Sequence, residues 1–177
     1  AVVDTPVYWS LFGQMVILGL CHVGGFGIMT GATLLGLLVM RRLRLGTRLI
    51  AQAETRSLGL GDVGAGLKLI QLVTFSVETL EAIVLILRLH YGYGEPWGSA
   101  FWNGVFHAVS AFNNAGFSTY SDNLMGFVAD PLIVVPIMLA IIIGGLAFPV
   151  LLELKREPGQ WAPWSIHTKI TLLGSGI

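Results

Sequence analysis

Two long stretches of this chain carry no full charge, and they constrain its fold more than any other feature. The first covers residues 5–40 and the second covers residues 131–152. A helix needs about 20 predominantly apolar residues to cross the hydrocarbon core of a bilayer, so both stretches are long enough. Only 11% of the 177 residues are charged, against roughly a quarter in an ordinary soluble domain. The sequence therefore predicts an all-α integral membrane protein.

Several other classes of protein are not indicated. The chain lacks an initial Met and a charged segment before its first apolar stretch, so we expect a fragment rather than a signal peptide. The formal net charge is zero, which does not suggest nucleic-acid binding. The single Cys21 excludes an internal disulfide and a cysteine-cluster metal site. Because no catalytic or phosphate-binding arrangement is present, we expect no enzyme activity and no cofactor.

The placement of basic residues predicts the membrane topology. Nine of the ten Lys and Arg residues lie within residues 41–68 or 155–169, and only Arg88 lies elsewhere. Residues 91–130 contain acidic residues but no Lys or Arg. Positive charge in short loops marks the cytoplasmic side, so the first two regions should be cytoplasmic and residues 91–130 should face outward.

The stretch from Ser99 to Phe112 is too short to cross the membrane. Ser99 is predicted to cap this helix after Pro96. At 1.5 Å per residue, about 14 residues reach some 21 Å, less than the roughly 30 Å of hydrocarbon. Because both flanking segments end on the outside, the stretch must enter and leave from that face. This is the topology of a re-entrant pore loop, with helices over about 67–89 and 131–152 on either side.

The sequence also resembles itself. Residues 23–28 match residues 143–148 at an offset of 120, and each match lies late in an apolar stretch. The unit predicted from this repeat is a helix, a pore loop and a second helix. Gly-Gly pairs also permit close helix packing, so packing alone remains the alternative explanation.

The predicted organisation has four segments, with one complete unit and parts of two others. They are a closing transmembrane helix of the first unit (residues 1–40, with its span from about residue 9), a basic cytoplasmic loop (41–66), a complete helix–pore loop–helix unit (67–152), and a cytoplasmic loop with the start of the next unit (153–177).

Residues 106–117, FHAVSAFNNAGF, resemble the second pore loop of the Ktr/Trk/HKT superfamily of potassium transporters. Residues 24–30 and 144–150 resemble the helices that close its first and second units, most closely in KtrB-type bacterial membrane subunits. The resemblance covers nearly the whole chain. It implies a multi-pass protein of the bacterial plasma membrane, four units around one potassium pathway, a homodimer, and a cytoplasmic nucleotide-binding regulatory subunit docking near residues 41–56.

The resemblance places the selectivity filter at Asn113, Asn114, Ala115 and Gly116. It implies that K⁺ binds the backbone carbonyl oxygens of Asn114, Ala115 and Gly116, with Asn113 at the cytoplasmic end. Carbonyls that point toward one axis need unusual backbone angles, which Gly adopts most easily. The asparagine side chains are expected to brace the loop. The alternative is that this stretch is only a helix C-cap and turn.

Other polar residues lie within the predicted helices. Glu78 and Glu81 share one helix face, and we expect them to face neighbouring helices. Arg88 is expected to extend to the membrane interface. His22 and His107 suggest a haem site only weakly, because they lie on different kinds of segment. The rival function is a non-conducting membrane scaffold that uses the Gly-Gly motifs for helix packing.

Overall fold

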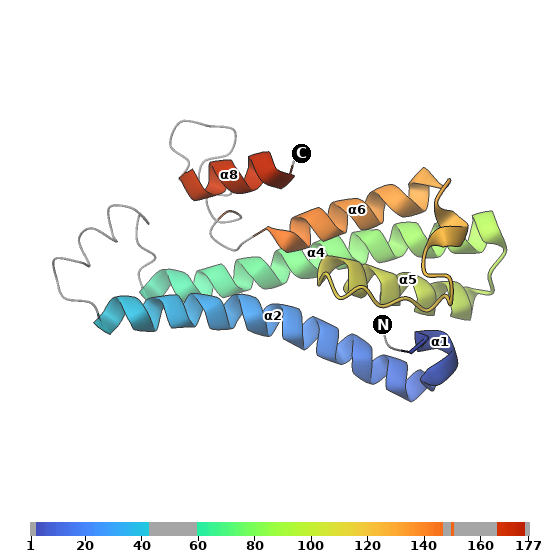
Figure 1. The fold of residues 1–177 in the computed structure, drawn as a ribbon, viewed down its shortest axis with the longest axis horizontal. Coiled ribbons are helices and arrows are strands. Elements are labelled where there is room, and N and C mark those ends of the chain that lie inside the picture. The colour runs from blue at the N-terminus through green and yellow to red at the C-terminus, as the bar shows by residue number, and fades with distance from the viewer. Residues whose placement is uncertain (1–2, 43–59, 147–149, 151–165, 176–177) are drawn as a thin grey trace. The chain divides into compact units, whose positions relative to one another are not determined.

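The computed structural model describes residues 3–42, 60–146, 150 and 166–175. All regular elements among these residues are helices, which confirms the all-α prediction for this part of the chain (Figure 1). No helix in the described ranges combines the length and hydropathy of a membrane span. In chain order the elements are α1 (Thr5–Tyr8), α2 (Leu11–Arg42), α4 (Leu60–Tyr93), α5 (Trp97–Phe112), the 3₁₀ helix η1 (Met125–Phe127), α6 (Pro131–Gly145) and α8 (Ile166–Ser175).

Contacts divide the chain into two units. Unit 1 comprises Ala1–Gly25 and Val73–Gly145, and it holds α1, the first part of α2, most of α4, α5, η1 and α6. Unit 2 comprises Phe26–Leu72 and Leu146–Ile177, and it holds the remainder of α2, the beginning of α4, and α8. The predicted pore loop lies entirely in unit 1. Most of the basic region at residues 41–66 lies outside the described residues.

Helix α5 starts earlier than predicted. Its N-cap is Pro96, with φ −56°, and the amide of Ala100 donates the first helical hydrogen bond to the Pro96 carbonyl at 2.9 Å. The Pro ring already holds a φ angle suited to a helix start, so the helix does not need Ser99 as its cap. Instead, the Ser99 hydroxyl donates to the Glu95 carboxylate at 3.2 Å. The prediction of a Ser99 cap was therefore wrong, whereas the helix ends at Phe112 as expected.

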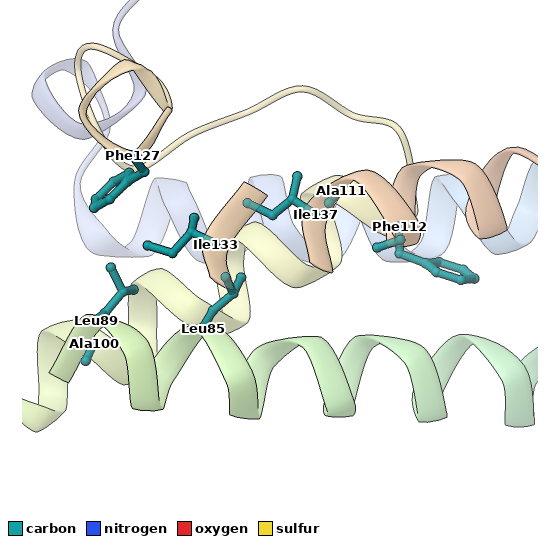
Figure 2. Packing of buried hydrophobic residues seen from close by; sticks show 9 residues of the cluster. Leu85, Leu89, Ala100, Ala111, Phe112, Phe127, Ile133 and Ile137 are labelled. Carbon is teal, nitrogen blue, oxygen red and sulfur yellow. The ribbon is translucent and has the colours of Figure 1, made fainter. Parts of the chain in front are cut away.

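The hydrophobic core of unit 1 lies where α5 packs between α4 and α6 (Figure 2). Leu85 comes from α4, Ala100 and Phe112 come from α5, and Ile133 comes from α6; all four are at most 5% exposed. Gly104 on α5 permits a close approach to α4, because a Cβ there would lie 3.1 Å from the backbone nitrogen of Ile86. Burial of these side chains fixes which faces of the three helices meet.

A polar cluster joins the ends of α4 and α6. Arg88 Nε donates to Asp130 Oδ2 at 2.7 Å, and Tyr93 donates to the same oxygen at 3.0 Å. The other carboxylate oxygen of Asp130 accepts from the amide of Leu132 at 3.0 Å, which caps α6. Arg88 thus has an acidic partner at this end of α4, and its extension to the membrane interface stays a prediction. Its hydrogen bond to Asp130 holds the pKa of that carboxyl below its usual value.

Substituting Gly104 with Ala should destabilise unit 1. The added methyl group must displace Ile86 or the α4 backbone, and overpacking of this kind costs about 1–3 kcal/mol. The measurement is the thermal unfolding midpoint of the full-length protein in detergent. Gly98→Ala, also on α5, is the matched control because a Cβ there meets no atom within 4 Å. Equal midpoints for the two variants would contradict the close approach.

The folded protein should lose stability in acid because Asp130 becomes protonated there. The folded-state pKa of this carboxyl lies below its usual value, so its contribution to stability is present above that usual value and is lost as pH falls through the folded pKa. We expect the unfolding midpoint to drop less between about pH 5 and pH 2 in Asp130→Asn than in the wild type. Asp122→Asn, which removes an exposed acid from the same connection between α5 and α6, should retain the wild-type pH dependence.

Candidate functional site

The four predicted filter residues follow directly from the C-terminal end of α5. Asn113 is the C-cap, and Asn114 has a left-handed φ of 52°. The amide of Asn114 donates to the Ala111 carbonyl at 3.0 Å, and the amide of Ala115 donates to the Ser110 carbonyl at 2.8 Å. These two bonds define a Schellman motif. The turn predicted as the alternative is therefore present, and Asn114, rather than Gly116, occupies its left-handed position.

The carbonyl oxygens beyond this cap are unpaired within the described part of the chain. No described residue donates a hydrogen bond to the carbonyls of residues 113–116. Gly116 has a φ of 71°, the left-handed region that side-chain-bearing residues rarely adopt. A change of backbone direction at Gly116 thus follows the one at Asn114. The arrangement leaves four consecutive backbone acceptors available to a ligand.

Ser110 holds the far end of this segment. Its hydroxyl donates to the Phe117 carbonyl at 2.7 Å and accepts from the Phe117 amide at 2.9 Å. His107, one turn earlier on α5, contacts Ser118 through Nε2 at 2.9 Å, while Nδ1 lies 2.7 Å from the Asn103 carbonyl. Because a carbonyl only accepts, Nδ1 donates to Asn103, and Nε2 of the neutral ring accepts from Ser118. The chain after Gly116 therefore runs back along α5.

Tyr120, further along the loop, is attached to Asn103 on α5 and to Glu95 just before that helix. The Tyr120 hydroxyl donates to Glu95 at 2.6 Å and accepts from the Asn103 side chain at 3.1 Å. Burial, followed by the hydrogen bond to Glu95, raises the pKa of Tyr120, so its phenol remains a donor at neutral pH.

The Asn113 side chain lies between α2 and α4. Its Nδ2 donates to Glu78 Oε1 at 3.0 Å and to the Val109 carbonyl at 2.9 Å. On α2, His22 Nδ1 lies 3.3 Å from the Glu78 carboxylate. Gly25 provides the space, because a Cβ there would overlap the Asn113 amide and lie 3.3 Å from Asn113 Cβ.

The opposite side of the loop faces α6. Asn114 Nδ2 donates to the carbonyls of Phe112 and Ile141, both at 3.4 Å. Gly144 is in tight contact with the end of α5, because a Cβ there would lie 2.7 Å from the Phe112 carbonyl carbon. The first Gly-Gly pair and the second therefore both lie against the C-terminal end of α5. Residues 147–148 of the predicted repeat lie outside the described residues, so the repeat stays a prediction.

Two cavities adjoin the extended segment after Ala115. One, of about 270 Å³, lies against α6, and the other, of about 250 Å³, is lined in part by residues 3–5. Gly116, Phe117 and Ser118 line both. The start of the chain thus lies beside the candidate filter.

The remaining predicted polar residues have different surroundings. Glu78 is bonded as described, whereas both carboxylate oxygens of Glu81 are buried without a hydrogen-bond partner among the described residues. His22 and His107 contact different partners, Glu78 and Ser118, and do not form a pair. The anchoring role of Ser110 was not predicted. The sequence did offer one indication of this role, because Ser110 is a hydroxyl residue six positions before Gly116 on the expected helix.

The described unit combines carbonyls that accept no hydrogen bond from a described residue with glycines of α2 and α6 that lie against the C-terminal end of α5. The chain belongs to the family described as TrkH, cation transport protein, whose match covers residues 2–157.

Relatives in this family have printed names that refer to potassium. The chain is 39% identical over 175 residues to Ktr system potassium uptake protein B of Bacillus subtilis (strain 168), covering 99% of this chain and 39% of that protein. It is 34% identical to Ktr system potassium uptake protein B of Vibrio alginolyticus, covering 99% and 38% of the two chains. It is 28% identical to potassium/sodium uptake protein NtpJ of Enterococcus hirae, covering 96% and 37%. The chain thus spans about two fifths of the length of these relatives.

The two glycines at the end of α6 should respond differently to substitution. Gly144→Ala would push a methyl group into the backbone of Phe112 and should destabilise the full-length protein by about 1–3 kcal/mol. Gly145→Ala is the matched control, because its Cβ would meet only Asn114 Nδ2 at 3.9 Å. Unfolding midpoints in detergent compare the two variants. If Gly145→Ala proved the more damaging, the assigned contact would be wrong.

Proposed function

We propose that this chain is part of a potassium uptake subunit and that K⁺ passes along the carbonyl oxygens of Asn114, Ala115 and Gly116, with Asn113 at the cytoplasmic end. The observation that carries the proposal is the set of consecutive carbonyls without a hydrogen-bond donor among the described residues. A potassium filter replaces the water shell of the ion with backbone carbonyls. These carbonyls stay available as oxygen ligands, and a cation is the ligand that a row of backbone oxygens favours.

The electrostatics of α5 support a cation at this place. The helix ends at Phe112, immediately before the filter residues, and the C-terminal end of a helix carries a partial negative charge. No side-chain carboxylate is required at the filter itself. The cavity lined by residues 3–5 and Gly116 brings the start of the chain beside the loop, which agrees with a pathway enclosed by several units.

Membership of a cation transport family supports a location in the bacterial plasma membrane, with the chain crossing it several times. The names of the relatives, which refer to a Ktr system, support a membrane subunit that works with other components. We include in the proposal a homodimer and a cytoplasmic nucleotide-binding regulatory subunit near residues 41–56. Most of that region lies outside the described residues.

The rival function is a non-conducting scaffold in which the Gly-Gly motifs serve only close packing. The contacts of Gly25 and Gly144 with the end of α5 are compatible with it. A scaffold does not account, however, for consecutive carbonyls that no described residue pairs, whereas a potassium filter requires them. Ion selectivity separates the two functions.

Gly116→Ser should impair potassium uptake and reduce the preference for K⁺ over Na⁺. A side chain at φ 71° is strained by roughly 1–2 kcal/mol, which turns the adjacent carbonyls away from their direction. The full-length variants are expressed in a strain deficient in potassium uptake, and growth at low K⁺ and the ⁸⁶Rb⁺ to ²²Na⁺ uptake ratio are measured.

Gly94→Ser is the matched control for this experiment. Gly94 has the same φ of 71° and the same open surroundings, but it lies between α4 and α5, outside the candidate filter. It should retain the wild-type uptake ratio. If Gly116→Ser also retains growth and ratio, the filter assignment is wrong.

A further inference from the structure

Hydrogen bonds from side chains fix the two ends of the candidate filter, whereas the carbonyls between them accept no hydrogen bond from a described residue. Ser110 binds both backbone groups of Phe117 after the filter, and Asn113 is bound before it. Between them, the carbonyls of residues 114–116 receive no hydrogen bond from any described residue. The direction of these carbonyls therefore depends on how rigidly the two ends are placed.

At the first end, the backbone of α5 alone does not fix the side chain of Asn113. One Nδ2 proton is bonded locally, to the Val109 carbonyl of the same helix. The other reaches Glu78 on α4, 35 positions away in the sequence, at 3.0 Å. On the other side of the loop, Asn114 makes only long contacts of 3.4 Å. Among the described residues, Glu78 thus provides the shortest side-chain hydrogen bond between residues 113–116 and another helix.

Glu78 is itself held in place. It is 6% exposed, and His22 Nδ1 on α2 lies 3.3 Å from both carboxylate oxygens. A buried acceptor with two partners from different helices has little rotational freedom. Displacing it would leave the Asn113 amide and the carboxylate without partners in a buried place, which is costly.

We propose that Glu78 is a positioning residue for the ion pathway: its carboxylate holds the Asn113 amide and thereby sets the direction of the carbonyls that follow. This inference rests on the proposed function. It concerns ion selectivity and not stability alone, because the carbonyl directions determine which ion is coordinated well. The role needs an oxygen acceptor at the correct reach and does not need a charge.

Two substitutions separate the distance that the Glu78 acceptor spans from the charge that it carries. Glu78→Gln keeps an oxygen acceptor at the same distance and removes the charge. Glu78→Asp keeps the charge and withdraws the acceptor by one methylene. We expect Glu78→Gln to retain the wild-type ⁸⁶Rb⁺ to ²²Na⁺ uptake ratio and Glu78→Asp to reduce it about fivefold, the effect of losing one hydrogen bond worth about 1 kcal/mol.

The experiment uses the full-length protein reconstituted in lipid vesicles, with the folded fraction checked by size-exclusion chromatography before reconstitution. Glu81→Gln is the matched control: Glu81 lies three residues further along α4, is 4% exposed, and has no hydrogen-bond partner among the described residues. It should retain the wild-type ratio. If both Glu78 variants keep the ratio, if both lose it, or if only Glu78→Gln loses it, the inference is overturned.

The wild-type uptake ratio distinguishes failure of this inference from failure of the proposed function. In that case the wild-type protein itself would show no preference for Rb⁺ over Na⁺ in the vesicles. If Glu78→Asp does not fold, Asn113→Ala tests the same bond from its other side, and it should reduce the ratio by a similar factor. A folded Asn113→Ala with the wild-type ratio would overturn the inference as well.

Discussion

The close packing around the C-terminal end of α5 is the constraint on which the rest of unit 1 depends. Gly25 on α2 and Gly144 on α6 both lack the Cβ that would collide with this end. Small residues allow helix backbones to approach closely, and here they leave room for an amide side chain as well as for a backbone. The hydrogen bond from Asn113 to Glu78 exists only because that space exists.

The sequence predicted the elements better than it predicted their contacts. The charge-free stretches and the short length of residues 99–112 gave the positions of α5 and α6, and α5 begins two residues earlier than expected. Those arguments rest on local properties of the chain. The contacts of Glu78 join residues 35 and 56 positions apart and depend on the rotation of α2 and α4 about their axes. Periodicity does not fix that rotation when the helices are apolar on every side.

The helix C-cap and the proposed filter are compatible. A Schellman motif uses the amides of Asn114 and Ala115 to satisfy the last carbonyls of α5. The motif does not use the carbonyls of these two residues, and no described residue donates a hydrogen bond to them. The cap therefore turns the chain sharply at Asn114 and presents a row of acceptors, and Gly116 with its φ of 71° redirects the chain again. Asparagine suits the first position because it tolerates a left-handed conformation and supplies an amide that reaches α6.

Carbonyls without a hydrogen-bond donor keep a common direction only if the loop that carries them is held from outside. A chain left to relax would rotate such carbonyls toward the nearest donor. Ser110 prevents this at Phe117, where one hydroxyl binds both the amide and the carbonyl. Glu78 opposes it at Asn113, from a different helix. The two attachments belong to α5 and α4, which share the core around Leu85 and Ala100. Burial of that core therefore keeps both attachments in place, and with them the direction of the carbonyls.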